Sequence, residues 1–190
     1  MRIRFACSVR PLLASDTRLD GYSGSILTEL DVFGEPPRRK RMRLAGHDYA
    51  GGVYFVTICT IGGHPLFGDI VNGRLVPSAI GEIVEHEWKR LSPILGIVFD
   101  EYIVMPNHMH AIVAVERGSK RSLSSVIQLF KSRAVKSLQA TYRDPECRIW
   151  QRSFHDDIVN GDDHLTAVRR YIRNNPSNWE ADEYWCRPQT

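Results

Sequence analysis

The chain has 190 residues, of which 43% are hydrophobic and 25% are charged, a balance typical of one folded domain with a short additional segment. The four cysteines form no Cys-x-x-Cys pair, which argues against a structural zinc knuckle and against a secreted disulfide scaffold. No run approaches the ~20 apolar residues of a membrane-spanning helix, and the formal net charge is a modest +3. We therefore expect a cytoplasmic protein.

The first part of the chain divides into an extension and the start of a domain. Residues 1–37 are rich in Ser, Thr, Asp and Gly without hydrophobic periodicity, which predicts a poorly ordered extension before a domain covering residues 38–190. Three elements open the domain: a strand at 54–60, a hairpin at 70–76 turning at Asn72-Gly73, and a helix beginning after Ser78.

The rest of the domain continues with two strands and two helices. Period-2 and period-3.6 apolar patterns place these elements, in chain order, at residues 97–105, 108–115, 123–142 and 162–175. The combined order predicts an α+β fold, in which an antiparallel sheet has its helices packed on one face. The strand at 108–115 is expected to lie centrally in that sheet.

The central strand contains His108-Met109-His110 inside an otherwise apolar run. Side chains alternate between the faces of a strand, so His108 and His110 point the same way while Met109 points to the other face. Two converging imidazoles suggest a metal site, provided that a further ligand completes it. The alternative is that they are hydrogen-bonded polar residues on a half-exposed strand.

The last predicted helix supplies a candidate nucleophile and a candidate ligand. Tyr171 and Asn175 are four residues apart, so they lie on the same helix face if the helix continues through its last turn. The Asn175 amide oxygen could complete a His-His-Asn set and hold the Tyr171 phenol beside the metal. The alternative is that Tyr171 is a packing residue and that Asn-Asn-Pro only ends the helix.

The positive charge is clustered in three patches that we interpret as candidate contacts to a polyanion. Their members are Arg38, Arg39, Lys40, Arg41 and Arg43, then Lys131, Arg133 and Lys136, and finally Arg169, Arg170 and Arg173. Each patch taken alone could also be an ordinary solvated helix surface.

Four motifs in this order resemble the HUH single-tyrosine transposases, in particular those associated with repetitive extragenic palindromes (REP). The motifs are Arg-Met-Arg-Leu-Ala-Gly-His-Asp-Tyr followed by Tyr-Phe-Val-Thr-Ile-Cys-Thr, then Val-Met-Pro-Asn-His-Met-His-Ala-Ile, Ile-Trp-Gln-Arg-Ser-Phe and Tyr-Ile-Arg-Asn-Asn-Pro-Ser-Asn-Trp. The resemblance covers the chain from about residue 38 to residue 179.

The resemblance implies a ferredoxin-like or RRM-like sheet with the HUH motif on a central strand. It implies that His108 and His110 bind a metal, that Tyr171 forms a 5′-phosphotyrosine with single-stranded DNA, and that Asn175 is the third ligand. The implied substrate is single-stranded DNA beside a hairpin, which would make the protein nucleoid-associated. Mg²⁺ or Mn²⁺ suits two imidazoles, an amide and phosphate oxygens, and both a homodimer and a monomer occur among such proteins.

One position departs from the pattern and leaves alternatives open. Asp157 stands where the family often has a histidine, with His155 two positions earlier. A domesticated protein that binds hairpin DNA without cleaving it is therefore the main alternative to a DNA nicking and rejoining enzyme. A metal-dependent hydrolase of small phosphoesters is a third reading, which leaves Tyr171 and the basic patches without a role.

Overall fold

The computed structural model describes residues 51–95 and 97–184. The extension at residues 1–37 and the basic run at 38–43 lie outside the described residues. Within the described part of the chain, no helix is long and apolar enough to cross a membrane.

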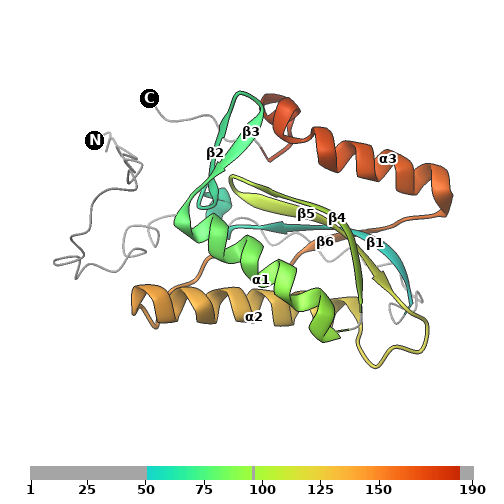
Figure 1. The fold of residues 1–190 in the computed structure, drawn as a ribbon, viewed down its shortest axis with the longest axis horizontal. Helices are drawn as coiled ribbons and strands as arrows, with labels where there is room; N and C mark the ends of the chain where they lie inside the picture. Colours follow the sequence, from blue (N-terminus) through green and yellow to red (C-terminus); the bar gives the residue numbers. More distant parts are fainter. Residues whose placement is uncertain (1–50, 96, 185–190) are drawn as a thin grey trace.

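A four-stranded antiparallel sheet forms the centre of the fold (Figure 1). Its strands, in spatial order, are β4 (Val98–Met105), β5 (His108–Val115), β1 (Gly52–Cys59) and β6 (His155–Ile158). A separate hairpin consists of β2 (Gly68–Val71) and β3 (Arg74–Pro77), and a short 3-10 turn, η2 (Ile61–Gly63), precedes it. The prediction that the His-x-His strand is central is confirmed, because β5 pairs with β4 on one side and with β1 on the other.

Two helices cover one face of the sheet. They are α1 (Ala79–Leu95) and α2 (Leu123–Tyr142). Met109, Ala111 and Val113 of β5 point to this face, where they join one large buried cluster with Phe130 of α2 and Trp88 of α1. This cluster is the main hydrophobic core.

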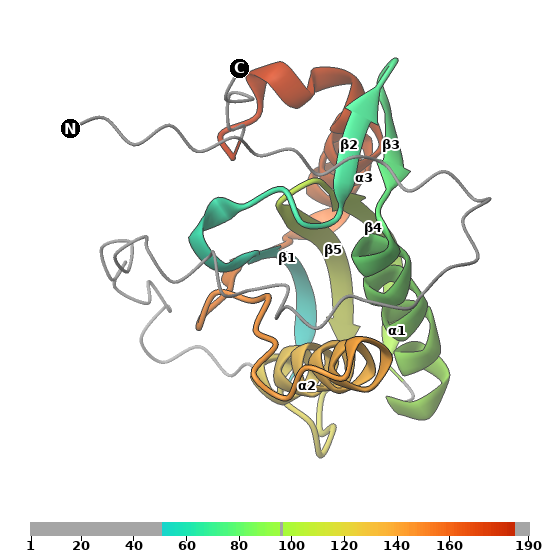
Figure 2. The same ribbon diagram turned by 90° about the vertical axis from the view of Figure 1, so that its left-hand side faces the viewer.

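The third helix lies on the opposite face, which corrects the expectation that all helices share one side. Helix α3 (Gly161–Asn174) buries Val168 and Ile172 in a smaller cluster with Ile112 of β5. Because side chains alternate along a strand, Ile112 points to the same face of the sheet as His108 and His110. Figures 1 and 2 both show the sheet between α3 and the α1–α2 layer. Since helices lie on both faces, β5 is buried along nearly its whole length.

Strand β6 is not among the elements predicted from the sequence. Its residues, His-Asp-Asp-Ile, have no apolar alternation that predicts a strand. They become a strand because β1 has a free edge, with Phe55 opposite Asp157 and Thr57 opposite His155. The tertiary pairing therefore overrides a weak local preference.

The local signals read from the sequence agree with the observed turns and caps. Asn72 and Gly73 both have positive φ, 52° and 69°, as the tight turn between β2 and β3 requires. The Ser78 hydroxyl accepts a hydrogen bond from the Gly81 amide at 3.1 Å and so caps the start of α1.

Candidate metal and nucleophile site

The two histidines of β5 meet at one point under α3. His108 and His110 are 0% and 1% exposed, and their Nε2 atoms lie 3.0 Å apart. They point to the same face because they are two residues apart on a strand. The two imidazoles therefore converge, as the sequence predicted.

Each histidine is oriented by a hydrogen bond to its other ring nitrogen. His108 Nδ1 lies 2.9 Å from Asn107 Oδ1, and His110 Nδ1 lies 2.9 Å from Thr57 Oγ1 on the neighbouring strand. Both contacts suit rings that carry the proton on Nδ1 and leave the Nε2 lone pair free, the arrangement that metal-binding histidines need. Burial lowers the pKa of each ring to about 3, so both are neutral at physiological pH.

Helix α3 brings Tyr171 and Asn175 to the histidine pair. The Tyr171 hydroxyl oxygen lies 3.4 Å from His110 Nε2, and the two ring centroids are 5.3 Å apart. Asn175 is 2% exposed, and its Oδ1 has no hydrogen-bond partner among the described residues. An unsatisfied buried amide oxygen is costly, and a cation beside it would satisfy it.

A carboxylate that the sequence analysis did not anticipate completes the group. After α3, the 3-10 segment η3 (Pro176–Ala181) leads back over the site and delivers Asp182. Ligand atoms of His108, His110 and Asp182 all lie within 4.8 Å of one another. Asp182 Oδ2 accepts a 2.8 Å hydrogen bond from Asn175 Nδ2 and lies 3.4 Å from the Tyr171 hydroxyl. No sequence spacing relates an aspartate that follows a helix to a histidine on a distant strand. The place of Asp182 in the site is therefore known only from the structure, in which the chain reverses at η3.

The Tyr171 hydroxyl lies at the border between the buried site and solvent. The residue is 44% exposed, and a hollow of about 270 Å³ is lined by Tyr171, Asn178 and Asp182 among others. Burial of the hydroxyl, together with the negative charges of Asp182 and Glu183, raises the pKa of Tyr171 to about 12. The phenol is therefore protonated at neutral pH, and positive charge near it is needed to form the phenolate.

Aromatic rings from the C-terminal segment cover the other side of the histidines. The Tyr184 ring centroid is 4.8 Å from that of His108, and the Trp179 centroid is 5.9 Å away. The Tyr184 carbonyl accepts a 2.7 Å hydrogen bond from Asn107 Nδ2, which ties this segment to the β4–β5 turn. The histidine pair is thus buried between these aromatic rings on one side and Tyr171 on the other.

The structure places the described basic patches on opposite faces of the sheet. Helix α2 lies on the face away from the histidines, where Lys131 Nζ donates to the Gln151 and Ser153 carbonyls and Arg133 pairs with Glu87. Helix α3, which carries the third patch, lies on the other face of the sheet, the face of the histidines (Figure 1). The two described patches therefore do not line one groove.

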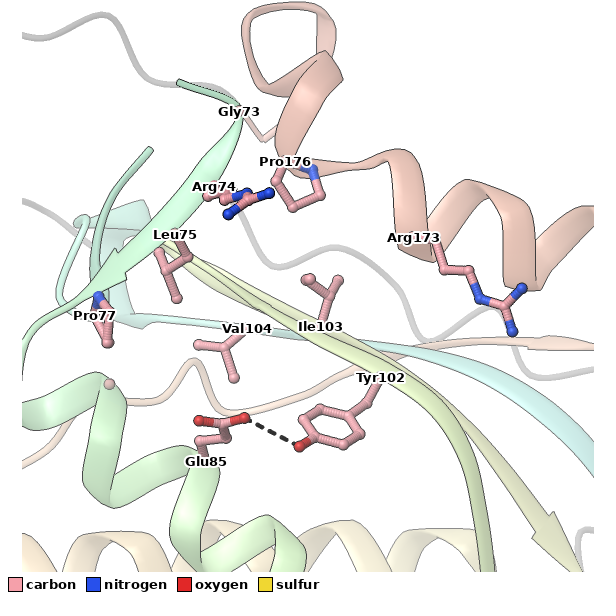
Figure 3. A pocket seen from close by; sticks show the side chains of 11 residues that line it. Gly73, Arg74, Leu75, Pro77, Glu85, Tyr102, Ile103, Val104, Arg173 and Pro176 are labelled. Atoms are coloured by element: carbon pink, nitrogen blue, oxygen red, sulfur yellow. Dashed lines mark hydrogen bonds between the residues drawn. The ribbon is translucent and has the colours of Figure 1, made fainter. Parts of the chain in front are cut away.

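The residues of the α3 patch differ in their partners. Arg169 pairs with Asp100 and Arg173 pairs with Glu101, both on β4. A cavity of about 600 Å³ lies beside this contact, between Arg173, the β2–β3 hairpin and Tyr102 (Figure 3). It contains none of the histidine-site residues.

Comparison with known protein families identifies the family of this chain. The family model described as "Transposase IS200 like" matches residues 75–175, just over half of the chain. The chain belongs to the IS200-like transposase family. The matched residues include the histidine pair, Tyr171 and Asn175, whereas Thr57 and Asp182 lie outside them.

Two known proteins are similar to this IS200-like transposase, one in sequence and one in structure. A protein of Haemophilus influenzae with no assigned function is 26% identical over 169 residues, which cover 77% of this chain and 93% of the relative. The solved structure of the REP-associated tyrosine transposase bound to a REP hairpin superposes with a TM-score of 0.56 at 18% identity, covering 73% of this chain and 74% of the other. That likeness shows a shared fold and confirms the α+β prediction.

Proposed function

We propose that this IS200-like transposase is a metal-dependent enzyme that nicks and rejoins single-stranded DNA beside a hairpin through a covalent 5′-phosphotyrosine on Tyr171. One observation carries the proposal. The Tyr171 hydroxyl lies 3.4 Å from His110 Nε2, which lies 3.0 Å from His108 Nε2. All three groups belong to one chain, so one subunit can supply the whole site, which supports the monomer among the two assemblies expected.

The donor set suits a divalent cation such as Mg²⁺ or Mn²⁺. His108 and His110 would hold it, the unpartnered Oδ1 of Asn175 would be the third ligand, and the Asp182 carboxylate is a further oxygen donor. Mixed imidazole and oxygen ligands with an open side fit these ions better than a closed zinc site. When bound, the cation would supply positive charge that favours the phenolate and offsets charge on the phosphate oxygens.

In this reaction Tyr171 is the nucleophile that attacks the DNA phosphate. Its phenol loses a proton to the solvent and its oxygen forms a bond to phosphorus, while the bond from phosphorus to the 3′ oxygen breaks and that oxygen leaves protonated. The 5′ end stays on the protein as a phosphodiester, which keeps the bond energy available for rejoining to a 3′ hydroxyl. The partial exposure of Tyr171 leaves room for a DNA strand at this point.

The substrate part of the proposal rests on the fold neighbour and on charge. The REP-associated tyrosine transposase with this fold is described as bound to a REP hairpin, and hairpin DNA is the substrate class we propose here. Among the described residues, Arg170 and Lys136 have no ion-pair or hydrogen-bond partner. They remain candidate phosphate contacts, as do the basic residues at 38–43. Lys131, Arg133, Arg169 and Arg173 are weaker candidates, because the structure gives their charged groups protein partners.

The decisive experiment looks for the covalent adduct. The protein is incubated with Mn²⁺ and a labelled oligonucleotide that has a hairpin and an adjoining single strand, and the products are resolved under denaturing conditions. We expect a protein–DNA adduct in the wild type and in Tyr102→Phe, which alters a tyrosine outside the site. No adduct is expected from Tyr171→Phe or after chelation of the metal.

Two outcomes would contradict the proposal. An equal yield of adduct from Tyr171→Phe would exclude this residue as the nucleophile. Tight hairpin binding with no adduct under any divalent metal would favour the non-cleaving DNA-binding protein. Asp157, the departure from the family pattern, is exposed on β6 opposite Phe55, so Asp157→His is the variant to examine in that case.

A further inference from the structure

Helix α3 carries the proposed nucleophile, yet it has little hydrophobic attachment to the sheet. Of its 14 residues only Val168 and Ile172 are buried, whereas the 20 residues of α2 include six buried side chains. The small cluster around Ile172 fixes the distance of the helix from the sheet. Contacts on the two flanks of the helix therefore help to set its rotation about its own axis.

Two ion pairs join α3 to the edge strand β4. Arg169 Nε lies 3.2 and 3.1 Å from the two carboxylate oxygens of Asp100, and the terminal nitrogen of the same guanidinium also contacts Asp100. Arg173 donates to Glu101 through Nε at 2.9 Å and through a second nitrogen. Both carboxylates are about three-quarters buried, whereas the Arg169 and Arg173 side chains are 38% and 62% exposed. Solvent therefore screens the charges in part, and the pairs act through their geometry, since each guanidinium makes more than one N–H···O contact.

An irregularity in β4 makes both contacts possible. Consecutive residues of a regular strand point to opposite faces, so Asp100 and Glu101 could not both reach one helix. The pairing of β4 with β5 shifts register between Phe99 and Tyr102, and the two acidic residues occupy this bulge. Bulges re-aim side chains and are over-represented beside active sites.

The arginines and the tyrosine lie on opposite flanks of α3. With about 3.6 residues per turn, Arg169 and Arg173 share one flank, Val168 and Ile172 face the sheet, and Tyr171 projects from the other flank. A contact on the arginine flank therefore sets the rotation of the helix. The same rotation decides how far the Tyr171 hydroxyl lies from His110.

We propose that Asp100 and Glu101, through Arg169 and Arg173, form a latch that positions α3 so that Tyr171 meets the histidine pair of its own chain. The four residues are positioning residues and touch none of the proposed reacting atoms. This inference rests on the proposed function for its catalytic consequence, but the attachment of α3 can be measured without it. A direct DNA contact by Arg169 and Arg173 is the competing role.

The test uses the full chain with Asp100→Asn and Glu101→Gln combined, which removes the partner charges and keeps the arginines. Amide hydrogen exchange of residues 161–174 is measured in the free protein, and the single-turnover rate of adduct formation and the Kd are measured with hairpin DNA. The control is Glu146→Gln, which removes the partner of Arg148 in a highly exposed pair.

The latch predicts faster exchange across α3, a rate of adduct formation lowered by about tenfold at saturating DNA, and an unchanged Kd. Reversing one pair, with Asp100→Arg and Arg169→Asp combined, should recover most of the rate, because the contact is restored with opposite polarity. The control variant should behave as the wild type in each measurement.

Unchanged exchange in α3 would overturn the latch, whatever the DNA chemistry. Normal rates at saturating DNA with an altered Kd would also overturn it, since the arginines would then be DNA contacts. Absence of adduct in the wild type would contradict the proposed function instead, and the exchange measurement would still decide whether the latch exists.

Discussion

Thr57→Val tests whether the histidine pair is a metal site that its neighbours orient. Thr57 is 4% exposed, and its hydroxyl lies 2.9 Å from Nδ1 of His110, which is 1% exposed. Valine has nearly the same shape as threonine but cannot hydrogen-bond. The substitution therefore leaves the His110 ring in place and removes the group that fixes its proton and its angle.

The magnitude follows from that single contact. Leaving a buried donor without a partner costs about 1–3 kcal/mol, and about 1.4 kcal/mol corresponds to a tenfold change in an equilibrium constant. We expect a reduction in Mn²⁺ affinity of about 10- to 100-fold, the range found when partners of metal-bound histidines are removed. The rate of adduct formation should recover when Mn²⁺ is raised, because the nucleophile is unchanged.

The assay is a Mn²⁺ titration by calorimetry, repeated with adduct formation as the readout. Thr60→Val is the matched control, since Thr60 is fully buried and its hydroxyl contacts the His64 and Asn107 carbonyls at 2.8 and 2.9 Å rather than a ring nitrogen. It should lower stability without shifting the Mn²⁺ dependence. Equal Mn²⁺ affinity in Thr57→Val and in the wild type would show that this contact does not prepare His110 for a metal.

Three further predictions concern the third ligand, the α3 contact and a half-buried lysine. Asn175→Ala should weaken Mn²⁺ binding in the same titration, because its Oδ1 has no protein partner among the described residues; unchanged affinity would exclude it as a ligand. Ile172→Ala should lower the free energy of unfolding in urea by about 2–5 kcal/mol and Ile172→Val by about 0.5–1.5 kcal/mol; a smaller loss for alanine than for valine would contradict the packing of α3. Burial lowers the pKa of Lys131 from 10.5 to about 8, so between these two pH values the unfolded state binds more protons than the folded state. The free energy of unfolding of the wild type, measured relative to that of Lys131→Met, should therefore rise with pH between about 8 and 10.5 and stay constant below pH 8. A relative free energy of unfolding that falls over this pH range would contradict the prediction.

Much of the fold could be predicted because the local patterns are strong. The strand at 108–115 and the helix at 123–142 have the predicted bounds, and the Asn72-Gly73 turn and the Ser78 cap are in place. Strand β6 could not be predicted, since its four residues are polar and depend on the free edge of β1. The prediction that α3 lies on the same face of the sheet as the other helices was also wrong. Hydrophobic periodicity shows that a helix has an apolar stripe, but it does not show which face of the sheet that stripe packs against.

The candidate site divides in the same way. The sequence by itself determined that His108 and His110 share one face of a strand and that Tyr171 and Asn175 share one side of a helix, because both follow from the repeat of the backbone. Only the tertiary structure decided that these two faces meet, that Thr57 and Asn107 orient the rings, and that Asp182 returns to the site. Except for the contact between the neighbours Asn107 and His108, these contacts join segments far apart in the chain. Their distances depend on how the strands pair and how the helix packs, which no local repeat specifies.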